Sequence, residues 1–85
     1  MGIFNLNGMV PTRNRILVRP LINLNITMEL EDPIMEGTII NIGPGEAEFR
    51  VGQRVFFETY SGTNITIDDW PHILMWRNNV LMYEA

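Results

Sequence analysis

No segment of this chain keeps a sustained 3.6-residue apolar period, and this limits what it can fold into more than any other feature. Short apolar or alternating segments occur instead, separated by turns rich in Gly, Pro or Asn. We expect strands at 15–19, 38–42, 54–58, 64–68, 73–76 and 80–83. About six short strands with such turns are typical of an all-β chain, folded as a small antiparallel barrel or sandwich.

The length of 85 residues indicates one domain over 1–85, and a domain this small is only marginally stable alone. The chain has no cysteine and one histidine, which excludes disulfides, thiolate metal sites and His-rich metal sites. Assembly into an oligomer is then the remaining common route to stability.

Six arginines face ten acidic residues, there is no lysine, and the net charge is −4. This balance argues against a nucleic-acid-binding protein. Segment 21–36 contains four acids and no basic residue, so the remainder of the chain is neutral. No run of 18 apolar residues and no signal peptide is seen, and we expect a cytoplasmic chain with no membrane partner. In such a chain the sequons at Asn25 and Asn64 are chance matches.

Catalytic chemistry finds little support. Adjacent carboxylates at Asp68 and Asp69 would point to opposite faces of a strand, so a turn explains them better. His72 has no nucleophile motif or metal-ligand partner near it, and 43–45 lacks the spacing of a phosphate loop. For the aromatic residues, core packing is favoured over a base-stacking platform; these are Phe56, Phe57, Tyr60, Trp70 and Trp76.

Segment 21–36 is the unusual part of the sequence. Its apolar and polar residues alternate from Leu24 to Leu30, but the dense negative charge would destabilise an unpaired strand. Two interpretations stay open: a solvated polar connection, or an interaction arm whose apolar residues add to a partner's groove.

Five ordered stretches resemble the GroES-like co-chaperonins. Gly37–Gly45 is similar to their G-x-V-x-x-V-G-x-G strand and turn, and 51–57 to their V-G-D-x-V-x-F segment. The other matching stretches are 11–18, 60–68 and 73–81, so that the resemblance covers about 9–84. It implies an irregular antiparallel β-barrel with a long mobile loop between the first two core strands.

The resemblance also implies a function and an oligomeric assembly. Seven subunits would form a dome-shaped lid on a sixty-kilodalton, GroEL-like chaperonin, which binds the ATP and encloses a client protein. The lid subunit itself would hold no cofactor and would not be an enzyme. Its N-terminal strand would pair with the C-terminal strand of the next subunit, through Val10, Ile16, Val18, Val80, Leu81, Met82 and Tyr83.

Segment 21–36 occupies the position of the family's mobile loop, which folds onto the chaperonin through a short apolar triplet. The expected chaperonin contacts here are Leu24, Ile26, Thr27, Met28 and Leu30. The segment lacks the family's glycine pair and is shorter. Residues 46–50 are too few for the family's roof hairpin, and 1–8 form an N-terminal extension. These departures suggest a divergent member, plausibly virus-encoded and acting in the host cytoplasm.

Two other functions are kept beside the lid subunit. One is a small β-barrel viral structural or adaptor module without a chaperonin partner. The other is an oligonucleotide-binding barrel, which the acidic charge opposes.

Overall fold

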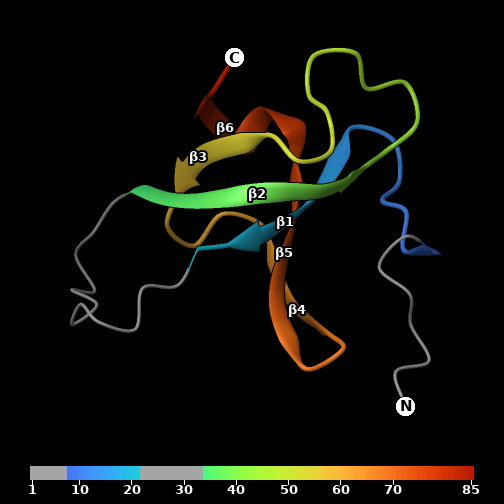
Figure 1. Ribbon diagram of the computed structural model, residues 1–85, viewed down its shortest axis with the longest axis vertical. Coiled ribbons are helices and arrows are strands. Elements are labelled where there is room, and N and C mark those ends of the chain that lie inside the picture. Colours follow the sequence, from blue (N-terminus) through green and yellow to red (C-terminus); the bar gives the residue numbers. More distant parts are fainter. Residues whose placement is uncertain (1–7, 22–33) are drawn as a thin grey trace.

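The computed structural model describes residues 8–21 and 34–85, and its regular structure is almost entirely β (Figure 1). Six strands are present, as predicted, and no α-helix occurs in these two ranges. The strands are β1 (Arg15–Pro20), β2 (Ile34–Ile42), β3 (Arg54–Glu58), β4 (Thr63–Ile67), β5 (Trp70–Trp76) and β6 (Val80–Tyr83). A single 3₁₀ turn, η2 (Arg77–Asn79), links the last two strands.

All six strands join one sheet in the order β4-β5-β1-β2-β3-β6, and every neighbouring pair is antiparallel. The predicted small antiparallel β fold is therefore confirmed, but the sheet is not closed into a barrel. Strands β4 and β6 occupy its two edges, and no pairing joins them within the described ranges. Figure 1 shows the β4–β5 hairpin projecting away from β6 and the C-terminus.

Two strands start three or more residues earlier than the sequence predicts, whereas the bounds of β1 and β4 differ from the prediction by one residue. Strand β2 begins at Ile34 rather than Thr38, because its first residues pair with β3 and so leave the predicted 21–36 loop. Strand β5 begins at Trp70, because the turn consists of Asp68 and Asp69 alone, both at positive φ. A two-residue turn of this kind matches the twist of the flanking strands.

The core lies on one side of the sheet and is built mainly from β-branched and aromatic residues. Its buried cluster consists of Ile16, Val18, Ile39, Phe49, Val55, Phe57, Ile73 and Met75. Gly37 is needed where β1, β2 and β3 pack most closely, since a Cβ there would lie 2.5 Å from the Val18 side chain and 3.1 Å from the Phe57 ring.

Candidate interaction surfaces

The C-terminal strand β6 is the first candidate surface, because it pairs with β3 along one edge only. An irregularity in this ladder leaves Leu81 as an extra residue between the pairs Phe56–Met82 and Phe57–Val80. Such a bulge re-aims side chains at a sheet edge. Leu81 and Met82 are both more than half exposed, and Tyr83 is also exposed. An edge strand with one open side and exposed apolar side chains is a template for pairing with another chain.

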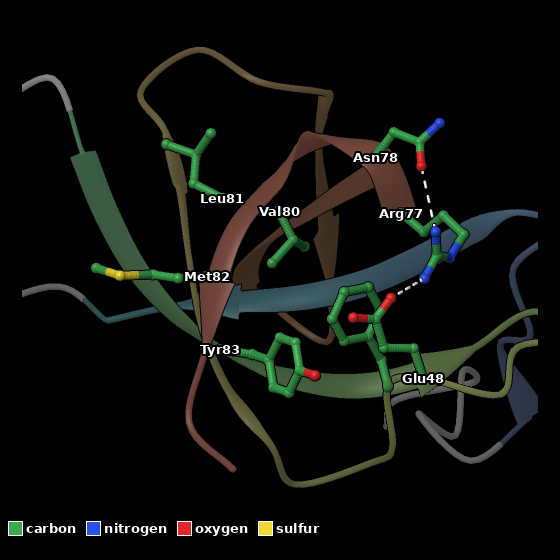
Figure 2. Close-up of a pocket in the computed structure, with 8 residues that line it drawn as sticks. Glu48, Arg77, Asn78, Val80, Leu81, Met82 and Tyr83 are labelled. Atoms are coloured by element: carbon green, nitrogen blue, oxygen red, sulfur yellow. Dashed lines mark hydrogen bonds and ion pairs between the residues drawn. The ribbon is translucent and has the colours of Figure 1, made fainter.

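An open hollow of about 400 Å³ lies beside β6, between this strand and the loop that precedes β3. Figure 2 shows Val80 and Tyr83 directed toward the side of Glu48 and Arg77, and Leu81 and Met82 directed away from it. The rings of Tyr83 and Phe49 meet edge to face, with centroids 5.3 Å apart. This contact fixes Tyr83 beneath the loop.

The short loop over 46–50 is held by one carboxylate. The Glu46 side chain is only 3% exposed, and its Oε1 accepts a hydrogen bond from Arg77 Nε at 2.7 Å. Its Oε2 accepts from the backbone N–H groups of Glu48 and Phe49, at 2.8 and 2.9 Å. Burial alone would raise the pKa of Glu46, but these bonds and the Arg77 charge outweigh it, so the pKa lies below the ordinary value.

Arg77 is correspondingly surrounded by acceptors. It also pairs with the Glu48 carboxylate and stacks over the Phe49 ring, with its Cζ 5.1 Å from the ring centroid. The hydrogen bonds to Glu46 and Glu48 raise the pKa of Arg77. The loop is thus braced against η2, which follows β5 directly.

A second ionic group ties the C-terminus to the start of β2. Arg54 on β3 pairs with Glu36 on β2 and, at 3.6 Å, with Glu84 just after β6. The Glu84 backbone is held by Gln53 Nε2, which donates to its carbonyl at 3.0 Å, and by the Arg54 carbonyl. Strand β6 therefore keeps a defined position although one of its edges is unpaired.

The structure divides the predicted interface residues into two groups. Ile16 and Val18 are fully buried in the core, and their strand β1 is paired on both sides, by β2 and β5. In the single subunit these two side chains therefore pack inside the core, and their place at a subunit interface stays a prediction. Val10 is 60% exposed, Val80 is half-buried, and the remaining β6 positions are exposed. The predicted chaperonin contacts, Leu24, Ile26, Thr27, Met28 and Leu30, lie outside the described residues.

The core explanation of the aromatic residues holds for Phe57 but is wrong for Trp70, Trp76 and Tyr60, which are all at least half exposed. The two tryptophans instead support arginines of β1. The Arg15 guanidinium carbon lies 4.2 Å from the Trp76 ring centroid, and that of Arg19 lies 4.8 Å from the Trp70 ring centroid. Sequence reasoning missed these pairs, because their signal is non-local: two strands distant in sequence lie side by side.

The Arg19–Trp70 pair borders a second open hollow, of about 420 Å³. Leu21, Ile40 and Pro71 supply apolar walls there. The hollow is a second candidate surface, and it lies next to the point where the chain leaves β1.

The described part of the chain contains no cluster of side chains that could bind a metal ion. His72 is 1% exposed, and its Nδ1 lies 2.9 Å from the Trp70 carbonyl oxygen. No group of three or more His, Asp or Glu side chains there could hold a metal ion. Asp68 and Asp69 form the β4–β5 turn, as the turn interpretation predicted. No helix in the described ranges is long and apolar enough to cross a membrane.

Comparison with known proteins gives a consistent result. The family model described as "Chaperonin 10 Kd subunit" matches residues 9–83. A protein named co-chaperonin GroES from Desulfatibacillum aliphaticivorans is 31% identical over 87 residues, covering 84% of this chain and 92% of the relative. Proteins of the same name from Kosmotoga olearia and Fervidobacterium nodosum are 31% and 29% identical, covering 85% and 84% of this chain and 91% and 90% of the relatives.

Proposed function

The chain belongs to the chaperonin 10 Kd subunit family and is a co-chaperonin, and from this premise we propose that it forms the ring-shaped lid of a sixty-kilodalton chaperonin. The observation that carries the proposal is the match to this family over residues 9–83, a range that contains all six described strands. The same match disfavours the viral adaptor without a chaperonin partner, and the relatives reported above are bacterial.

Ring formation is supported by the edge strand β6. We place the joint between subunits at Val80, Leu81, Met82 and Tyr83, which would receive the N-terminal stretch around Val10 from a neighbour. A pairing between two different surfaces of identical subunits closes into a ring when the rotation allows it. The proposed ring has seven members, as the family resemblance implies.

Chaperonin contact is assigned to segment 21–36, with Leu24, Ile26, Thr27, Met28 and Leu30 as its apolar contacts. The topology supports this assignment, since the segment starts directly after β1 ends at Pro20, and its last residues, from Ile34 onward, already belong to β2. Because these two strands pair antiparallel, with Pro20 opposite Gly37, the two described ends of the connection lie at the same end of the sheet. Identical arms on a ring turn weak single contacts into strong collective binding.

The proposed role needs no chemistry from this chain. ATP would be bound by the chaperonin, the client would be enclosed beneath the lid, and the co-chaperonin would hold no cofactor and act in the cytoplasm. If the chain is encoded by a virus, that would be the host cytoplasm.

Native mass spectrometry tests the assignment, first on the protein alone and then with a bacterial chaperonin and ADP. We expect a heptamer of the 9.8 kDa chain that adds to one end of the chaperonin. A protein that stays monomeric under all conditions would contradict the ring and favour the adaptor. A heptamer without affinity for that chaperonin would contradict the choice of partner.

A double variant, Ile26→Ser with Met28→Ser, tests the arm separately. We expect it to lose chaperonin binding while the ring mass stays unchanged. Retained binding would remove these two residues from the contact.

A further inference from the structure

The positively charged side chain of Arg19 lines the hollow at the end of β1. Arg54 and Arg77 form ion pairs, whereas Arg19 forms none with any residue the structure describes. The Arg19 guanidinium instead lies over the ring of Trp70, a residue that is 56% exposed. An exposed guanidinium held over an indole ring is preorganised to receive a carboxylate.

The walls of the hollow are apolar next to this cation. Leu21 is 62% exposed, and Ile40 and Pro71 complete the lining with Trp70. The hollow therefore combines one positive charge with an adjacent apolar surface. A matching ligand is a carboxylate that stands beside an aliphatic or aromatic side chain, as on the surface of a protein.

The position of the hollow indicates which partner protein would supply this carboxylate. The backbone N–H of Leu21 donates to the Glu36 carbonyl at 2.8 Å, and Pro20 pairs with Gly37. These contacts close the root of the β1–β2 connection, and Leu21 itself lines the hollow. Any partner that holds the 21–36 segment near its root stands within a few residues' length of Arg19, at about 3.3 Å per residue.

We propose that this hollow is a second contact for the chaperonin, in which Arg19 pairs with a carboxylate of the chaperonin and Trp70 and Leu21 cover an adjacent apolar side chain. The inference rests on the proposed function and adds a rigid contact on the sheet to the arm. A contact made by preformed strands binds without the ordering cost that a folding segment carries.

The chain contains its own control for this proposal. Arg15 and Trp76 repeat the stacked pair on the same two strands, at the other end of their ladder. Arg15 lies four residues from Arg19, about 13 Å along the strand. The two pairs share their chemistry and differ in their distance from the root of the 21–36 segment.

The test compares Arg19→Glu and Trp70→Ala with the matched variants Arg15→Glu and Trp76→Ala. Each is measured as an intact ring binding a bacterial chaperonin with ADP, and native mass spectrometry verifies the ring. We expect at least a tenfold loss of affinity for Arg19→Glu and Trp70→Ala, with a smaller loss for Arg19→Lys, which keeps the charge but stacks less well. We also expect less than a threefold change for the Arg15 and Trp76 variants.

Equal losses at Arg15 and Arg19 would reveal a general charge effect and overturn the proposal. Unchanged or increased affinity of Arg19→Glu would overturn it too, the increase indicating that acids of this chain itself occupy the hollow. A wild-type ring that binds no chaperonin would instead refute the proposed function, and this inference with it. The Ile26→Ser, Met28→Ser ring separates these cases, because its loss of binding proves that the assay reports contact through the arm.

Discussion

Glu46 is the residue on which the short loop before β3 depends. Its carboxylate accepts three hydrogen bonds, two from backbone N–H groups and one from Arg77, while it is almost completely buried. A buried acceptor with these partners is costly to alter, because each donor would lose its acceptor away from water. These bonds therefore hold the 46–50 loop in a defined position without the roof hairpin that other family members have.

Replacing Glu46 by Gln should lower the free energy of unfolding by about 1–3 kcal/mol at neutral pH, since the charge and one good acceptor are lost. The pKa of Glu46 is lower in the folded protein than in the unfolded chain, so its contribution is present above about pH 4.5 and disappears as the pH falls through the folded value. Denaturant unfolding of both proteins from pH 7 to pH 3 should therefore show the difference shrinking below pH 4.5. Glu48→Gln, at a side chain 46% exposed, should cost under about 0.5 kcal/mol. A difference independent of pH would contradict this account.

Of the glycines that the structure describes, Gly43 lies closest to another stretch of backbone. A Cβ at this position would lie 2.1 Å from the Thr12 carbonyl oxygen, and the Gly43 N–H donates to the Arg15 carbonyl at 3.0 Å. Gly43→Ala should therefore lower the free energy of unfolding by about 1–3 kcal/mol, the usual cost of overpacking. Gly8→Ala is the control, because no atom lies within 4 Å of a Cβ built there. Equal thermal midpoints for the two variants would show that 9–14 moves aside freely.

At the scale of elements, the local sequence pattern predicted the six strands. It did not predict the features that depend on which strands pair. Strand β3 has the predicted bounds because turn residues delimit it on both sides, and β6 starts as predicted because the turn over Arg77–Asn79 precedes it. The early start of β2 could not be predicted, because it depends on a ladder with β3, about twenty residues away. The exposed tryptophans were missed for the same reason, since only the β1–β5 pairing places them beside arginines.

The edge strand β6 gives a prediction about assembly. Leu81→Asp with Met82→Asp should dissociate the ring and leave the folded subunit, because both side chains are more than half exposed and charges at a strand edge oppose pairing. Size-exclusion chromatography would measure the assembly, and circular dichroism the retained β structure. Tyr60→Asp, at a residue 82% exposed on the β3–β4 turn, should leave the ring intact. A ring that survives the double variant would place the joint elsewhere on the sheet.

At the scale of the whole molecule, the open sheet and the small size point the same way. A chain of 85 residues buries a single modest core, and among the described residues β4 and β6 each have a partner strand on one side only, so the proposed association with other copies would supply what the subunit lacks. The family and its ordered motifs were accessible from the sequence, whereas the Arg19 hollow required three strands to be placed together.

In the proposed ring, several identical arms bind the chaperonin together. Rings mixed from wild-type and Ile26→Ser, Met28→Ser subunits should bind the chaperonin progressively more weakly as the variant fraction rises, because each lost arm removes one intramolecular contact at high effective concentration. Native mass spectrometry resolves rings by their number of variant subunits, and the bound share of each composition gives its relative affinity. We expect the logarithm of affinity to fall steadily with each substituted subunit. A single wild-type arm that sustains full binding would refute the avidity mechanism, and a loss of all binding at the first substitution would show that the arms act as one cooperative unit.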